Sequence, residues 1–123
     1  MQCTCIEVNC DDSCDTILQE IVKARKPYQC CECNETIQKG EMYEHYAGKY
    51  EGAIFHRKTC KDCLSLRDAY FCSYSFGNIW DLFKQEVYEC SGNICLEPME
   101  QLTPKAREKA CKIIDEYWRD NVD

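Results

Sequence analysis

The chain has no apolar run that approaches 18 residues, so its sequence predicts no membrane-spanning helix. Its first residues, MQCTCIEVNCDDSCD, contain neither a basic region nor an apolar core, and we therefore expect no secretory signal peptide. It also lacks a Walker lysine loop, a G-x-G-x-x-G sequence and an H-E-x-x-H sequence. Only two histidines, His45 and His56, are available as general bases or open-site metal ligands. These absences favour a binding protein over an enzyme.

Cysteine is the residue present in excess, because 13 of the 123 residues are cysteines. In a secreted chain such a fraction predicts a disulfide scaffold. Here the count is odd and no signal peptide is expected, so complete disulfide pairing is disfavoured. A reducing cytoplasm and metal-binding thiols fit this composition better.

The net charge of −7 is unevenly distributed along the chain. Residues 1–22 contain five acidic residues and no Lys or Arg, and residues 68–123 contain eleven acidic residues against six basic ones. Residues 23–67, in contrast, carry nine basic residues against six acidic ones. Proteins that bind nucleic acid are usually basic overall, so the acidity argues against that function while leaving a local basic face in the middle.

Turn signals and aromatic runs predict an extended segment in the middle of the chain. Pro27 disfavours helix immediately before it, so residues 23–29 are expected to be extended. Two aromatic-rich runs flank Gly48 and Gly52. This pattern predicts a β-hairpin over residues 40–56, with a long turn between its strands.

Helices are predicted on both sides of this segment, over residues 15–24, 59–71, 75–89 and 102–121. Thr59 is the expected N-cap of the second helix, with Asp62 in the capping-box position. Thr103 is the expected N-cap of the last helix, with Pro104 at its first position. The buried stripe of the last helix is expected to contain Ala106, Ala110, Ile113, Ile114, Tyr117 and Trp118.

Two C-x-x-C pairs, Cys30/Cys33 and Cys60/Cys63, are the candidate ligands of a metal ion. Asn34 follows the first pair and tolerates the left-handed conformation that closes a zinc knuckle. The second pair falls in the first turn of a predicted helix, where residues three apart share a face. Knuckle, hairpin and helix in this order predict a treble clef around Zn²⁺. Four cysteine ligands leave no open position for water, so such a site is structural and adds on the order of 10 kcal/mol to folding.

Other readings of these residues remain open. A redox C-x-x-C usually opens a helix in a βαβ unit, which is not expected around Cys30. Cys31 could replace Cys30 as the ligand, although C-x-C is a less usual spacing, and His56 could replace a cysteine. We prefer Cys31 as a packing residue, His56 as a strand-end residue beside the metal, and His45 as a surface or hairpin-packing residue.

A second cysteine set near the start of the chain has the spacing C-x-C-x₄-C-x₃-C and consists of Cys3, Cys5, Cys10 and Cys14. It could close a second zinc site, or it could be an acidic tail with free thiols. It could also share ligands with Cys72, Cys90 or Cys95. Cys111 lies on the apolar side of the last predicted helix, where we expect a small core residue.

Residues 23–44, KARKPYQCCECNETIQKGEMYE, and 55–71, FHRKTCKDCLSLRDAYF, resemble a group of small, mostly uncharacterised zinc-finger-like proteins encoded by bacteriophages and prophages. The likeness lies in the basic ARKP lead-in, the CCEC knuckle, the I-x-x-G-E-x-Y turn and the TC-x-x-C-x-x-LRD helix. It covers about residues 23–72 and extends weakly to LTPKAREKAC. The resemblance implies four zinc ligands, Cys30, Cys33, Cys60 and Cys63, and a bacterial host cytoplasm, but no activity.

The same segment is loosely similar to the fingers of poly(ADP-ribose) polymerases and to LIM domains. Those modules have a histidine among their ligands, whereas this chain offers a second C-x-x-C pair. We therefore do not infer from this likeness that the chain binds DNA. HNH nucleases need a histidine at the end of the first hairpin strand and another on the helix. His45 is near the first place, but residues 59–71 contain no histidine. Cys31 beside a general base could act as a nucleophile, but an adjacent zinc knuckle explains it more simply.

The expected fold is therefore α+β: a zinc-bound treble clef elaborated with C-terminal helices. Residues 1–22 form an acidic, cysteine-rich segment, residues 23–72 the zinc module, and residues 73–123 a helical part packed on that module in a single domain.

The favoured functional hypothesis is a small accessory binding module that engages a host or viral protein. Its acidic ends would steer it towards basic partner surfaces. The candidate anchors are the hairpin aromatics Tyr43, Tyr46, Tyr50 and Phe55. The alternative is that these side chains pack against the zinc helix.

The second hypothesis is binding of DNA or RNA by the basic middle segment. The candidate residues are Lys23, Arg25, Lys26, Lys39, Lys49, Arg57, Lys58 and Lys61. The alternative is a solvated basic surface that balances acidic neighbours. The overall acidity leads us to prefer a protein partner.

Overall fold

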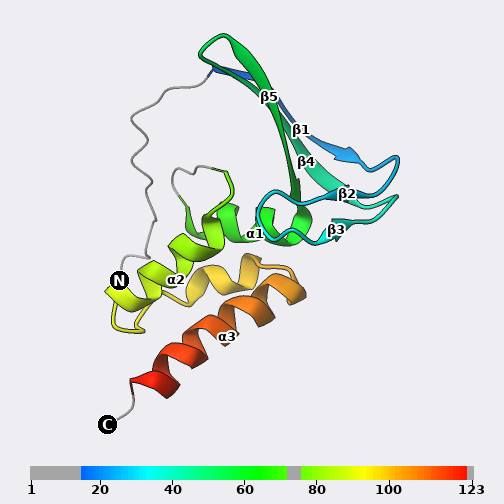
Figure 1. The fold of residues 1–123 in the computed structure, drawn as a ribbon. Coiled ribbons are helices and arrows are strands. Elements are labelled where there is room, and N and C mark those ends of the chain that lie inside the picture. Colours follow the sequence, from blue (N-terminus) through cyan, green and yellow to red (C-terminus); the bar gives the residue numbers. More distant parts are fainter. Residues whose placement is uncertain (1–14, 72–75, 122–123) are drawn as a thin grey trace.

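The computed structural model describes residues 15–71 and 76–121, which form a mixed α+β fold (Figure 1). Its elements are β1 (Asp15–Lys23), β2 (Tyr28–Gln29), β3 (Thr36–Ile37), β4 (Met42–Tyr50), β5 (Ala53–Cys60), α1 (Lys61–Tyr70), α2 (Ile79–Glu89), the 3₁₀ helix η1 (Glu97–Gln101) and α3 (Pro104–Asp120). An antiparallel sheet with the order β1-β4-β5 extends away from the helices, and β2 and β3 form a separate short hairpin.

The first strand corrects the predicted helix over residues 15–24. Those residues form β1, which pairs antiparallel with β4 from Asp15 opposite Lys49 to Lys23 opposite Met42. The β-branched residues of this segment suit a strand, and the backbone groups of β4 offer partners that a short isolated helix would lack. Residue 22, the predicted end of the N-terminal segment, lies inside this strand.

The hairpin of β4 and β5 is confirmed, but its turn is tighter and later than predicted. Glu51 and Gly52 connect the strands with φ angles of 49° and 82°, the conformation of a two-residue type I′ turn. Gly48 lies inside β4 instead. A Cβ atom there would come within 2.7 Å of the Phe55 ring. Glycine, which has no side chain, therefore allows the ring to pack against the backbone of β4.

The start of α1 also differs from the prediction. The N-cap is Cys60 rather than Thr59, because β5 continues through Cys60 and turns the Thr59 side chain into a buried position. Asp62 does not complete a capping box. Its carboxylate accepts a 2.6 Å hydrogen bond from the hydroxyl of Thr103 at the start of α3.

The later helices follow the sequence more closely. The helix predicted over residues 75–89 begins only at Ile79, after Gly77 with a φ of 94°. The cap predicted for α3 is confirmed, since the Thr103 hydroxyl accepts a 3.2 Å hydrogen bond from the N–H of Ala106 and Pro104 is the first helical residue.

The apolar face of α3 is shorter than predicted. Ala106, Ala110 and Ile114 are buried, whereas Trp118 is 44% exposed and lies on the last turn. Cys111 is exposed, which corrects its assignment to the core. It follows Ala110 by one residue, and the 100° step of an α-helix turns it off the buried face.

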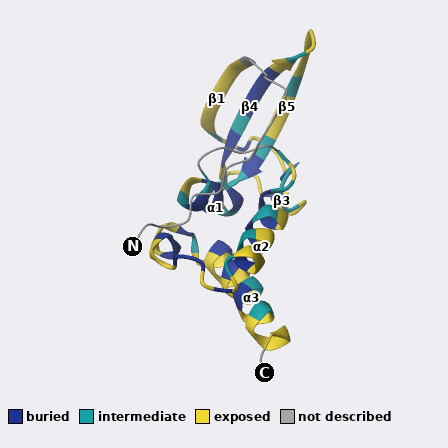
Figure 2. Ribbon diagram, turned by 90° about the vertical axis from the view of Figure 1, so that its left-hand side faces the viewer, coloured by how far each residue is buried: buried dark blue, intermediate teal, exposed yellow. Residues whose placement is uncertain are grey.

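The core lies where the helices meet the lower end of the sheet, and β4 is the most buried strand (Figure 2). The rings of Tyr70 and Phe83 join α1 to α2 in an edge-to-face contact with centroids 5.2 Å apart. Large fully buried side chains include Ile37, Leu66, Tyr70, Ile79, Phe83 and Val87.

A buried ion pair connects the sheet to α1. Glu44 of β4 accepts a hydrogen bond from the guanidinium of Arg67, and both side chains are almost fully buried. The same carboxylate accepts a 3.1 Å hydrogen bond from the side-chain amide of Gln19 on β1. These contacts therefore tie β1, β4 and α1 together.

Candidate metal centre

The first half of the site is a tight turn between β2 and β3. The N–H of Cys30 donates to the carbonyl of Glu35, and the N–H of Asn34 donates to the carbonyl of Cys30, each at 3.0 Å. Asn34 has a φ of 62°, which confirms the predicted left-handed residue. This turn directs Cys30 and Cys33 towards the same point.

The second half is the junction of β5 and α1. Cys60 ends the strand and caps the helix, and its Sγ accepts a hydrogen bond from the N–H of Cys63 at 3.5 Å. The N–H of Cys60 lies 3.4 Å from the Sγ of Cys30, which connects the two halves. Because Cys60 and Cys63 are three residues apart around one helical turn, their sulfurs lie on the same side.

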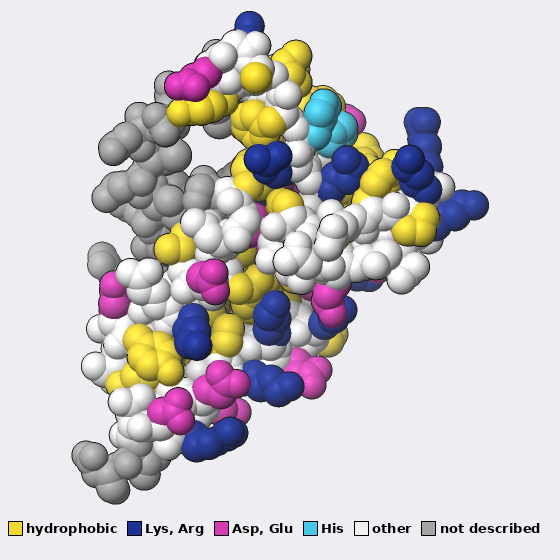
Figure 3. Space-filling view, viewed as in Figure 1, with side chains coloured by type: hydrophobic (Ala, Val, Ile, Leu, Met, Phe, Trp, Pro, Cys, Tyr) yellow, Lys and Arg dark blue, Asp and Glu magenta, His cyan; other side chains and the backbone are white. Residues whose placement is uncertain are grey.

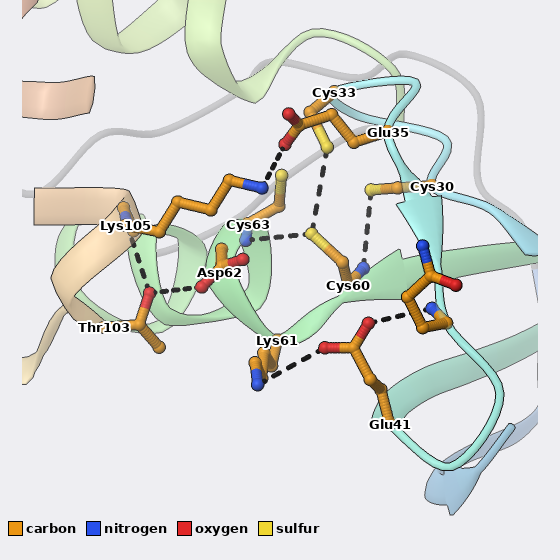
Figure 4. Close-up of polar contacts among 12 residues, drawn as sticks. Cys30, Cys33, Glu35, Glu41, Cys60, Lys61, Asp62, Cys63, Thr103 and Lys105 are labelled. Carbon is orange, nitrogen blue, oxygen red and sulfur yellow. Dashed lines mark hydrogen bonds and ion pairs between the residues drawn. The ribbon is translucent and has the colours of Figure 1, made fainter. Parts of the chain in front are cut away.

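Together the two halves bring four sulfurs into one cluster, in which the Sγ atoms of Cys30, Cys33, Cys60 and Cys63 all lie within 4.8 Å of one another (Figure 4). The Sγ atoms of Cys33 and Cys60 are 3.8 Å apart. An ion bound tetrahedrally at about 2.3 Å from each sulfur would set neighbouring sulfurs about 3.8 Å apart. The donor set and its spacing can therefore hold one metal ion.

Burial and mutual hydrogen bonding make the four thiols electrostatically interdependent. Hydrogen bonds from the thiols of Cys60 and Cys63 hold the pKa of Cys30 far below its usual range. The hydrogen bonds that Cys60 and Cys63 make to Cys30, together with burial, raise the pKa of Cys63 well above its usual range and that of Cys60 to about 12. Four thiolates held this close together would repel one another strongly, and a bound cation would offset that repulsion.

Backbone and indole N–H groups point at the sulfurs. The N–H of Glu32 lies 3.4 Å from Cys30 Sγ, and the indole Nε1 of Trp80 donates to Cys63 Sγ at 3.2 Å. Such donors stabilise thiolates and orient them. Trp80 was not among the residues that the sequence singled out, because it lies 17 positions after Cys63 and no local spacing relates the two.

The basic residues near Cys60 in the sequence make contacts away from the sulfurs. Lys61 lies at the start of α1 but pairs with Glu41 at 3.3 Å, and Arg57 donates to the carbonyl of its neighbour His56. Instead, Lys105 of α3 reaches across to Glu35 of the knuckle at 2.8 Å (Figure 4). The C-terminal helix is thereby connected to the cysteine cluster.

Cys31 lies outside the cluster. Its Sγ is 3.6 Å from both the Thr59 hydroxyl and the Glu32 carboxylate, and burial raises the pKa of the Cys31 thiol to about 11. The Glu32 carboxylate also accepts hydrogen bonds from the N–H groups of Gly77 and Ile79 at the start of α2. The knuckle therefore packs against α2 through the residues between its ligands.

Other candidate ligands are not in this cluster. His56 contacts His45 through a 3.0 Å Nδ1···Nε2 hydrogen bond on the sheet. Cys95 is buried, and the thiol of Cys90 donates to Glu86 at 3.5 Å. Within residues 15–71 and 76–121, the four clustered cysteines are the one group of three or more His, Cys, Asp or Glu side chains that already converge closely enough to hold a metal. The predicted second set and one cysteine proposed to share its ligands lie outside the described residues: Cys3, Cys5, Cys10, Cys14 and Cys72.

The predicted aromatic anchors are only partly accessible. Tyr43 and Tyr46 are buried, which removes them as contact residues for a partner. Tyr46 packs against Phe55 and Phe76, and Tyr43 packs against Tyr28. Of the four candidates, Tyr50 and Phe55 are half-buried. The exposed apolar side chains on the strands are instead Ile17, Leu18, Ile21, Met42 and Ile54.

Some of the predicted basic residues gather at the base of the sheet. A groove of about 690 Å³ is lined by Lys23, Arg25, Tyr28 and Tyr43, among others. The ammonium groups of Lys26 and Lys58 lie 5.8 and 4.9 Å from the centre of the Tyr28 ring. Arg57 lies on the opposite face, because side chains alternate along β5, and there it covers the Phe55 ring.

No protein-family model, curated protein or solved structure matches the chain. In the part of the chain that the structure describes, no helix is both long and apolar enough to cross a membrane.

Proposed function

We propose that the chain is a zinc-stabilised treble-clef module whose metal is structural. The supporting observation is the convergence of four sulfurs from a knuckle and from the first turn of α1, with the β4–β5 hairpin between them in sequence. Four sulfur donors at tetrahedral spacing suit Zn²⁺, or iron as the alternative, and leave no open coordination position. Such a site needs reduced thiols, which a reducing cytoplasm maintains.

Metal analysis of the purified, reduced protein tests this proposal. We expect at least one zinc per chain, and one fewer in Cys60→Ser, which should also lose the ordered hairpin and helix. Cys111→Ser is the matched control, because Cys111 is exposed and outside the cluster. A well-folded preparation without zinc, iron, cobalt or nickel would refute a structural metal site.

We further propose that the module serves to bind a protein, of the host or of a virus, through the edge strand β1. Among the residues that the structure describes, this strand pairs with β4 on one side and is the edge of the sheet. It is nine residues long and presents Ile17 and Ile21, which are 55% and 52% exposed. A long apolar edge strand can be extended by an added strand, and its apolar side chains give that pairing specificity. The occupant favoured by this geometry is an extended segment of another protein.

Affinity capture from host lysate, with and without nuclease, compares three forms of the protein. Ile17→Lys with Ile21→Lys should lose a nuclease-resistant partner that the original chain retains. Ile54→Lys is the control, because Ile54 is 62% exposed but lies on the other edge strand, β5. Equal capture by all three forms would exclude β1 as the binding strand. Concentration-dependent dimerisation abolished by the β1 changes would identify a second copy as the occupant.

Nucleic acid is the second candidate partner, supported by the basic groove around Tyr28. Lys and Arg side chains gather beside the sheet in Figure 3, and Lys26 and Lys58 flank an aromatic ring on which a base could stack. Fluorescence anisotropy with random single and double strands would show an affinity that falls steeply with salt. Lys26→Ala with Lys58→Ala should reduce that slope. Binding that is absent at low salt would exclude this candidate.

A further inference from the structure

Both histidines of the chain meet on one face of the sheet, away from the cysteine cluster. His45 of β4 and His56 of β5 are diagonal neighbours, since His45 lies opposite Lys58 and His56 lies opposite Ala47. Their rings are nearly parallel, with centroids 5.2 Å apart and planes 23° apart. Nε2 of His45 lies 3.0 Å from Nδ1 of His56. In Figure 3 the histidine side chains are visible at the surface of the sheet.

The strands on either side place charged residues on the same face. Glu20 of β1 lies directly opposite His45, and directly opposed side chains of an antiparallel pair are about 5 Å apart at Cβ. Lys58 lies opposite His45 on the other side, but its ammonium is 4.9 Å from the centre of the Tyr28 ring and is therefore directed towards that ring. The groove that Glu20 and His45 line is open to solvent, so an ion has access.

The separation of the two nitrogens suits a shared metal ion. Two imidazole nitrogens bound at about 2.0–2.1 Å are about 2.9 Å apart when they subtend 90° at the metal and about 3.4 Å apart at the tetrahedral angle. The observed 3.0 Å lies between these values. Small ring rotations would let both lone pairs converge on one ion, once the ring that donates the present hydrogen bond has moved its proton to its other nitrogen.

We propose that His45 Nε2 and His56 Nδ1 form a second, exchangeable site for a divalent transition-metal ion, and that the Glu20 side chain turns towards the bound ion to supply a third ligand. Imidazole with carboxylate is a donor set for Zn²⁺, Ni²⁺ or Cu²⁺ rather than for Mg²⁺ or Ca²⁺. Unlike the four-cysteine cluster, this site is exposed and leaves coordination positions open. Open positions allow exchange with solvent ions or completion of the site by a ligand from a partner.

Nickel added to the zinc-loaded protein tests this proposal, because Ni²⁺ is paramagnetic and does not oxidise thiols as Cu²⁺ does. The measurement is the broadening of the imidazole signals in ¹H–¹⁵N spectra. Since the chain has two histidines, each ring signal can be assigned by its loss in the corresponding variant. We expect both rings to broaden together as Ni²⁺ is added, with one apparent dissociation constant.

His45→Ala and His56→Ala should each weaken Ni²⁺ binding at the remaining ring by at least about tenfold. Glu20→Gln should weaken it less, and Lys49→Ala, an exposed residue on the same strand as His45, should leave it unchanged. Unaltered zinc content in each variant shows that the fold is retained. Ni²⁺ that leaves both rings sharp, or that binds each single-histidine variant as tightly as the original chain, would overturn the site. An unchanged affinity in Glu20→Gln would remove the carboxylate from it.

Discussion

Replacing each of two adjacent cysteines by alanine separates a ligand from its neighbour. Cys30 is fully buried, and its Sγ lies within 3.4 Å of two backbone N–H groups in the cluster. Cys31 is half-buried, and its Sγ contacts the Thr59 hydroxyl and the Glu32 carboxylate instead. The two changes remove the same atom from consecutive residues, so a difference in bound metal between the two variants reports which sulfur is a ligand.

The expected losses in the free energy of unfolding differ several-fold between the two variants. Cys30→Ala removes one of four ligands of an ion whose binding contributes on the order of 10 kcal/mol to folding. That is comparable to the whole free energy of unfolding of a small domain, about 5–15 kcal/mol. Cys30→Ala should therefore lose the metal and the ordered knuckle. Cys31→Ala removes one half-buried sulfur and should cost about 1–2 kcal/mol while keeping the metal.

The assay combines metal stoichiometry with urea unfolding, each with and without a chelator. The original chain and Cys31→Ala should both lose stability when the chelator removes zinc. The stability of Cys30→Ala should not change with the chelator, because this variant holds no zinc in the cluster. Zinc lost in Cys31→Ala and retained in Cys30→Ala would move the ligand by one residue. Loss in both variants would indicate a bridged cluster with more than one metal, contrary to the geometry described above.

Three further changes test contacts around the site and the sheet. Trp80→Phe keeps an aromatic ring but removes the N–H donor to the sulfur of Cys63. Zinc affinity, measured by chelator competition, should therefore fall about tenfold. An unchanged affinity would show that this hydrogen bond is dispensable. Arg67→Leu should cost about 3–5 kcal/mol in urea unfolding because it leaves the Glu44 charge buried without its partner. Adding Glu44→Leu should recover part of that loss. A double variant no more stable than the single one would contradict this reasoning. Gly48→Ala should cost about 1–3 kcal/mol in urea unfolding by forcing the new methyl against the rings of Phe55 and Tyr46. Phe55→Leu should relieve the part of this loss that comes from the Phe55 ring, and an unchanged stability in Gly48→Ala would exclude the clash.

Local spacing was sufficient to predict the two cysteine pairs and several helix ends. The two C-x-x-C pairs, the left-handed Asn34 and the capped start of α3 at Thr103 each depend on residues at most four positions apart. At that range the backbone conformation of a turn or helix determines which side chains and N–H groups meet. The sequence by itself therefore determined which cysteines form each pair, whereas the meeting of the two pairs depends on a contact between residues 30 positions apart.

Contacts between distant segments decided the rest. Ile17, Leu18, Ile21 and Val22 fit a short amphipathic helix, but pairing with β4 made this segment a strand. Trp80 reaches the cluster through the packing of α2 on α1, and no spacing in the sequence connects them. The histidine pair likewise exists only because β4 and β5 pair in one register, and a shift by one residue would place the two rings on opposite faces. Backbone pairing and core packing join residues that are distant in the sequence, and their free energy outweighs weak local preferences. These contacts form only when the whole chain folds.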